Sequence, residues 1–136
     1  MKTRQISITI VTVLMAVGGT WFSRAEDKNR PTTSEIMKEK LDYSHMILNG
    51  IATENYDLVL RNAENLSRLS QANAWRARQT PEYEILSAEF RRQADALAKA
   101  AKDRNIDAAS LAYVQMTLSC VNCHKYMRGK KMARAF

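Results

Sequence analysis

The chain has few of the residues that break helices or cross-link a fold. Its 136 residues include four glycines, two prolines and two cysteines. This leaves few positions for the tight turns that join short strands, and no run of alternating polar and apolar residues is evident. The apolar residues recur instead at the three- and four-residue spacing of helices. We therefore expect an all-α fold.

Most of the sequence carries no excess of positive charge. Removing Lys2, Arg4 and Arg24 lowers the formal net charge from +7 to +4. The remaining excess follows His124, where no acidic residue occurs, and consists of Lys125, Arg128, Lys130, Lys131 and Arg134. The segment between these two ends is nearly neutral, so the high isoelectric point predicts no nucleic-acid binding. The basic tail suits the negative end of a helix dipole, with an acidic partner or a lipid surface as alternatives.

Residues 1–25 have the pattern of a secretory signal peptide. Lys2 and Arg4 precede an apolar run over residues 6–19, and Ser23 and Ala25 are small residues placed as at a cleavage site. A membrane-spanning helix needs about 20 apolar residues, whereas serine, threonine and glycine interrupt this run. We expect cleavage after Ala25 and a single periplasmic domain over residues 26–136, with an uncleaved membrane anchor as the alternative.

The first helix of the domain is expected to begin after Thr32. Thr32 and Glu35 have the spacing of a capping box, and Gly50 marks the expected end of the helix. One stripe of this helix carries residues at four- and three-residue spacing, namely Met37, Leu41, Ser44 and Leu48. Such a stripe is typical of an amphipathic helix.

Three further amphipathic helices are predicted. The second covers residues 56–71, and the third begins at Pro81 after the capping residue Thr80. The fourth begins near Asp107, and its apolar stripe leads into the cysteine pair through Leu111, Val114, Leu118 and Val121. Four helices of this length with short links predict an up-and-down, antiparallel four-helix bundle.

The two cysteines belong to the string Cys120-Val121-Asn122-Cys123-His124. Cys-x-x-Cys-His is the attachment motif of c-type haem, in which the thiols form thioethers with the haem vinyl groups and the imidazole binds iron. On a helix the three side chains project from one face, because they lie at positions i, i+3 and i+4. We therefore expect one covalent haem c near the C-terminal helix, with His124 as axial iron ligand.

Other uses of the cysteine pair stay open as alternatives. A redox-active dithiol usually follows a strand, and none is predicted here. A zinc site needs four ligands, and His45 is the only other histidine. A disulfide between residues i and i+3 closes too small a loop to stabilise much. A non-haem metal or dithiol redox module is thus a second alternative to haem binding.

A Cys-x-x-Cys-His motif near the C-terminus, on the last of four helices, resembles the cytochrome c′ family of class II c-type cytochromes. The resemblance covers about residues 33–130, and Arg128, four residues after His124, matches the family's usual arginine beside the haem-binding histidine. The family often has an aromatic residue directly before that arginine, where this chain has Met127. The acid- and proline-rich connection between the second and third helices of the family is also shortened here.

In this family the first helix covers the opposite face of the iron. Low-spin members place a methionine there and carry electrons, whereas high-spin members leave the iron five-coordinate. Met37-Lys38, 13 residues before Gly50, is similar to the ligand position of the low-spin members, which implies Met37 as sixth ligand. His45, about 12 Å further along the helix, and an open position are the alternatives.

The resemblance and the export signal together predict a periplasmic monohaem cytochrome that carries single electrons between redox partner proteins. The alternative is a five-coordinate haem protein that binds a small gas such as NO or CO. No distal acid–base pair of the kind that peroxide chemistry needs is evident, so we expect no enzymatic activity. Family members often pair through their first two helices, so a homodimer is open, although no residue argues for it.

Overall fold

The structure is a computed structural model that describes residues 31–72 and 80–132, and the side chains of residues 130–132 are not described. The described helices belong to one compact unit that starts at Pro31. The predicted signal peptide or anchor, residues 1–25, lies outside the described residues. The same holds for Arg134 of the basic tail.

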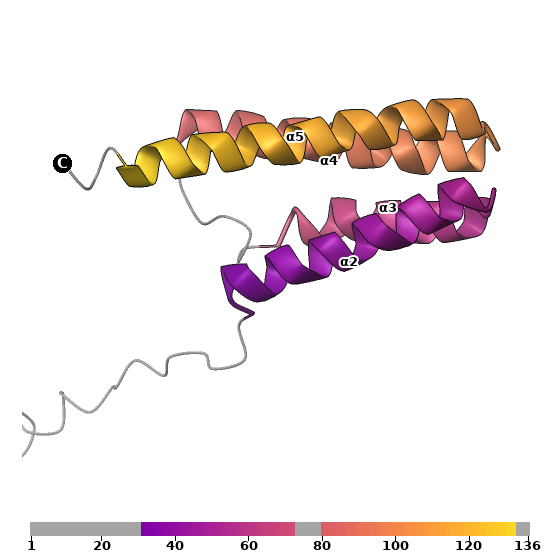
Figure 1. Ribbon diagram of the computed structural model, residues 1–136, viewed down its shortest axis with the longest axis horizontal. Helices are drawn as coiled ribbons and strands as arrows, with labels where there is room; N and C mark the ends of the chain where they lie inside the picture. The colour runs from indigo at the N-terminus through magenta and orange to yellow at the C-terminus, as the bar shows by residue number, and fades with distance from the viewer. Residues whose placement is uncertain (1–30, 73–79, 133–136) are drawn as a thin grey trace, which may run out of the picture. The chain divides into compact units, whose positions relative to one another are not determined.

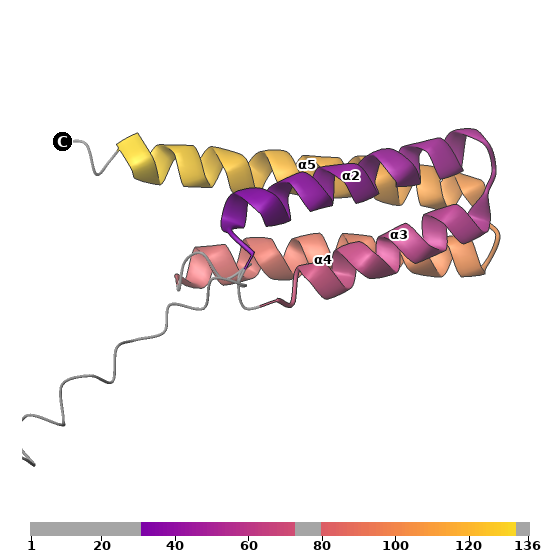
Figure 2. The same cartoon turned by 90° about the horizontal axis from the view of Figure 1, so that it is seen from below.

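Four helices and no strand make up the secondary structure of the described residues. They are α2 (Thr33–Ala52), α3 (Tyr56–Leu69), α4 (Pro81–Lys102) and α5 (Ile106–Met132). Each helix packs against the next one in sequence, and α2 also contacts α5 (Figures 1 and 2). None of the four combines the length and apolarity that crossing a membrane requires. The expected all-α helical bundle is confirmed.

The starts of α2 and α4 follow the predicted capping residues. The Thr32 hydroxyl accepts a hydrogen bond from the backbone N–H of Glu35, and the Glu35 carboxylate accepts one from the backbone N–H of Thr32 at 2.7 Å. The Thr80 hydroxyl accepts a bond from the backbone N–H of Tyr83, and Pro81 occupies the first turn of α4. These bonds satisfy backbone donors that a helix start leaves unpaired.

The two short connections, between α2 and α3 and between α4 and α5, use the same turn. In each, a residue with positive φ (50° and 51°) precedes an asparagine whose side chain caps the next helix, at Glu54-Asn55 and Arg104-Asn105. The backbone N–H of each asparagine donates to the carbonyl five residues earlier, at 2.8 and 2.9 Å. These bonds satisfy the last carbonyls of the preceding helix.

The prediction that Gly50 ends the first helix is wrong. Helix α2 continues to Ala52, and Gly50 is buried within it. A Cβ atom at this position would lie 2.8 Å from Cγ2 of Val59. The glycine is therefore explained by the close approach of α2 and α3, and Glu54 adopts the left-handed conformation after the helix end.

The buried residues of α3 and α4 form much of the core, whereas the predicted apolar stripes of α2 and α5 lie largely outside it. Helix α2 buries Ile36 and Ile47 and leaves Leu41 and Leu48 exposed. Helix α5 buries small residues and one methionine, namely Ala109, Ala112, Met116 and Ser119, and exposes Leu111, Val114, Leu118 and Val121. Small side chains let α5 approach the alanine-rich face of α4 closely, so the larger apolar stripe of α5 turns outward.

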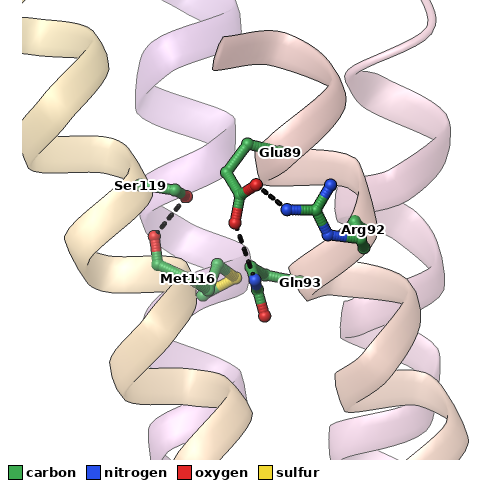
Figure 3. Close-up of polar contacts among 5 residues, drawn as sticks. All are labelled: Glu89, Arg92, Gln93, Met116 and Ser119. Carbon is green, nitrogen blue, oxygen red and sulfur yellow. Dashed lines mark hydrogen bonds and ion pairs between the residues drawn. The ribbon is translucent and has the colours of Figure 1, made fainter. Parts of the chain in front are cut away.

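Figure 3 shows polar contacts within α4 and within α5 where these two helices lie side by side. On α4, the Glu89 carboxylate pairs with Arg92 and accepts a hydrogen bond from Gln93 at 2.8 Å. On α5, the Ser119 hydroxyl donates to the Met116 carbonyl at 2.7 Å. Each of these bonds lies within one helix, so they satisfy polar groups beside the contact without joining the two helices.

Candidate functional site

A cavity of about 390 Å³ lies between α2 and α5. These two helices contact each other much less than the other neighbouring pairs do. Helix α2 lines the cavity with Met37, Lys40, Leu41 and Ser44. Helix α5 lines it with Met116, Cys120, Val121, His124 and Arg128. The buried side chains of Leu66 from α3 and Phe90 from α4 also border the cavity, so all four helices contribute to it.

Four of the five residues predicted to bind haem line this one cavity. Cys120, His124 and Arg128 come from α5, and Met37 comes from the facing helix α2. Cys123 does not line the cavity, but it lies one turn from Cys120 on the same uninterrupted helix. His124 and Arg128 are exposed, whereas Met37 is half-buried, so the imidazole and the guanidinium border the open side of the cavity.

The two cysteines are half-buried free thiols. Burial raises the pKa of both, and the positive charge of Lys40 opposes this rise. A thiol with a raised pKa is protonated at neutral pH, since apolar surroundings favour its uncharged form. The Cys120 thiol thus brings an uncharged sulfur to the α5 side of the cavity.

Lys40 brings a charge into the cavity. Its Nζ atom lies 3.6 Å from the centre of the Phe90 ring, a cation–π distance that joins α2 to α4. Burial lowers the pKa of the Lys40 ammonium to about 8, against the opposing effect of Cys120 and Cys123. Lys40 follows Met37 by three residues, so both side chains lie on neighbouring parts of the α2 surface.

Seven residues that line the cavity were not singled out from the sequence as site residues, namely Lys40, Leu41, Ser44, Leu66, Phe90, Met116 and Val121. Phe90 is a buried residue of α4, but periodicity does not tell which core residue borders a cavity. The place of Lys40 at the site could have been predicted from the sequence, because Lys40 lies three residues after Met37 on the same helix. Met116 lies outside the predicted stripe of α5 and is almost fully buried.

His45, the alternative sixth ligand, is exposed on α2 and does not line the cavity. Among the described residues, no three or more histidine, cysteine, aspartate or glutamate side chains gather to hold a metal ion. What the cavity combines is a thiol, an imidazole and a thioether around largely apolar walls. Comparison of the chain with models of protein families, with curated proteins and with solved structures gives no match.

Proposed function

We propose that the chain is a monohaem c-type cytochrome of the periplasm that carries single electrons between redox partner proteins. One observation carries the proposal: Cys120 and His124 border an apolar cavity from one helix, and Met37 borders it from the facing helix. The chemical types of these residues suit a haem. The porphyrin needs apolar walls, its iron binds imidazole and thioether ligands, and its vinyl groups form bonds with thiols.

Helix α5 would hold the haem covalently. Cys120 and Cys123 would supply the two thiols, and His124 would supply the imidazole that binds iron. Their spacing on one continuous helix brings the two thiols and the imidazole to the same side. Arg128 lies one turn beyond His124 at the cavity, where its guanidinium can pair with a carboxylate of the cofactor.

Met37 is the proposed sixth ligand from α2. A bound haem supplies one-electron chemistry at its iron, and methionine opposite histidine raises its reduction potential. With His124 and Met37 both bound to it, the iron would transfer electrons without binding a substrate. Leu66, Phe90 and Met116 are buried at the cavity, and their apolar side chains would face the porphyrin on its inner side.

The proposal includes the up-and-down arrangement of the bundle. Helix α2 ends at Ala52 and α3 begins at Tyr56, while α4 ends at Lys102 and α5 begins at Ile106. Connections this short join antiparallel neighbours in helical bundles. Both connections support the arrangement in which a C-terminal haem helix faces the first helix across the cavity.

The second candidate is a five-coordinate haem protein that binds NO or CO. One observation favours it: Lys40 shares the cavity with Met37, and its ammonium could donate a hydrogen bond to a gas bound on iron. A dithiol redox module is less well supported, because the reactive cysteine of such a module has a lowered pKa, whereas burial raises the pKa of both thiols here.

The absorption spectra of the ferric and ferrous chain test the proposed ligation. We expect low-spin spectra with the methionine-to-iron charge-transfer band, and loss of that band in Met37→Leu. Met46→Leu is the matched control, because Met46 lies on the same helix, is exposed and does not line the cavity. A high-spin native spectrum, or rapid CO binding by the native ferrous chain, would favour the gas-binding candidate instead.

A further inference from the structure

One face of α5 carries large apolar side chains that do not enter the bundle. Leu111, Val114, Leu118 and Val121 are 61%, 55%, 57% and 42% exposed. They recur at three- and four-residue spacing, so they form a single stripe along the helix. The stripe lies opposite the buried side of α5, where Ala109 and Met116 pack. We call it the α5 stripe.

The α5 stripe ends in opposite charges. Asp107 lies four residues before Leu111, and Lys125 lies four residues after Val121, so both continue the stripe at helical spacing. Both are exposed, and neither forms an ion pair within the described part of the chain. An acidic end, four apolar side chains and a basic end therefore follow one another along one face.

Between these ends, α5 is free of charge. Residues 108–123 include no aspartate, glutamate, lysine or arginine. The exposed side of α4 differs, because it carries Glu84, Arg92, Asp95 and Lys99. A helix that packs against the α5 stripe would therefore remove water from charged groups only at the two ends of the stripe. There, a residue of opposite charge on the packing helix can form an ion pair with each of them.

The order of residues along the α5 stripe is complementary to itself. A second copy can pack antiparallel against the first, with the two-fold axis passing near Met116 of both copies. In this register, Leu111 of one copy faces Val121 of the other, and Val114 faces Leu118. Asp107 of each copy then faces Lys125 of the other. Each pairing occurs twice. In a parallel arrangement, Asp107 would face its own copy and so would Lys125, and like charges would repel at both ends. The charges therefore select the antiparallel arrangement.

We propose that the α5 stripe is the interface of a homodimer in which the α5 helices of two copies pack antiparallel about a two-fold axis. The alternating three- and four-residue spacing is the one that side chains of two packed helices use to interdigitate. The interface would cover Val121, which also borders the cavity. This surface is distinct from the pairing through the first two helices that the family resemblance implies.

Sedimentation equilibrium of the full chain, as purified from the cell, tests the dimer. We expect a dimer that dissociates on dilution, and a monomer at the same concentrations for Leu118→Asp. The matched control is Ile85→Asp on α4, which is 68% exposed and lies off the stripe, and it should remain dimeric. Unchanged far-ultraviolet circular dichroism would show that both variants keep their helices.

A charge swap tests the antiparallel register. Asp107→Lys should weaken the dimer about tenfold, because two ion pairs become two repulsions. Asp107→Lys combined with Lys125→Asp should restore the affinity. A native chain that is monomeric throughout, a dimeric Leu118→Asp variant, or a double variant as weak as the single one would overturn the proposal. The mass of the assembly reports dimerisation whether or not haem is bound, so this failure is distinguishable from failure of the haem proposal.

Discussion

Lys40 of α2 holds its ammonium nitrogen 3.6 Å from the centre of the Phe90 ring of α4, inside the cavity that also contains Cys120 and His124. The ring face attracts the cation, but burial removes much of its hydration. Burial lowers the pKa of the Lys40 ammonium to about 8, and this effect is larger than the opposing effects of Cys120 and Cys123. Lys40 is thus a charged side chain at a position where an uncharged one would cost less.

Replacing Lys40 with methionine is expected to stabilise the chain. The pKa of Lys40 is about 8 in the fold against an ordinary value of 10.5, so between these pH values the unfolded chain binds more protons than the folded chain. The free energy of unfolding therefore rises as pH increases from 8 to 10.5, and below 8 the cost of burying the charge is fully present. Lys40→Met should add about 1 to 3 kcal/mol at pH 7, discounted for partial solvent exposure, and should flatten this rise.

Urea unfolding of the chain produced without a haem supply, with its thiols free, measures both effects. Lys38→Met is the control, because Lys38 is an exposed lysine on the same helix. It should change the free energy of unfolding by no more than about 0.5 kcal/mol. A Lys40→Met variant that is less stable than the native chain at pH 7 would contradict the explanation.

The two glycines of the domain should respond oppositely to alanine. A Cβ at Gly50 would lie 2.8 Å from Cγ2 of Val59, whereas a Cβ at Gly129 would meet nothing within 4 Å. Gly50→Ala should lower the free energy of unfolding by about 1 to 3 kcal/mol through overpacking of α2 against α3. Gly129→Ala should raise it by up to about 1 kcal/mol, because alanine favours the helix. Thermal unfolding of both variants measures the difference, and equal effects would refute it.

Two tyrosine hydroxyls join helices at different distances. The Tyr126 hydroxyl lies 2.9 Å from the Thr80 hydroxyl at the start of α4, and the Tyr113 hydroxyl lies 3.3 Å from the Ser44 hydroxyl of α2. Tyr126→Phe should cost about 1 kcal/mol of stability, and Tyr113→Phe should cost less because its bond is longer. Denaturant titration of the two variants side by side compares them, and the reverse order would count against this reading of the contacts.

The starts of the helices could be predicted from the sequence because local chemistry determines them. Thr32 and Thr80 bond backbone donors within three residues of themselves. The end of α2 was predicted wrongly for a non-local reason. Gly50 has the residue type of a helix end, but it is a glycine because α3 passes close to it, and that approach is not visible in the residues around it.

The part of the candidate site that a sequence motif specifies could be predicted. The part that depends on how the helices pack could not. The spacing of Cys120, Cys123 and His124 is a local feature of one helix. Periodicity identifies the stripe that includes Leu118, but it cannot tell which side of α5 faces the core. Helix α5 has two candidate faces, and the one with small residues packs inward. The same limit applies to Lys40, whose charge predicts an exposed position but whose side chain is partly buried in the cavity.

The mass of the intact chain under denaturing conditions tests the haem proposal most directly. For a chain produced in a cell that makes c-type cytochromes, we predict the mass of the polypeptide plus one haem, because thioether bonds survive unfolding. A variant with Cys120→Ala and Cys123→Ala should have the mass of the polypeptide alone. A native chain with the mass of the polypeptide alone would contradict the account.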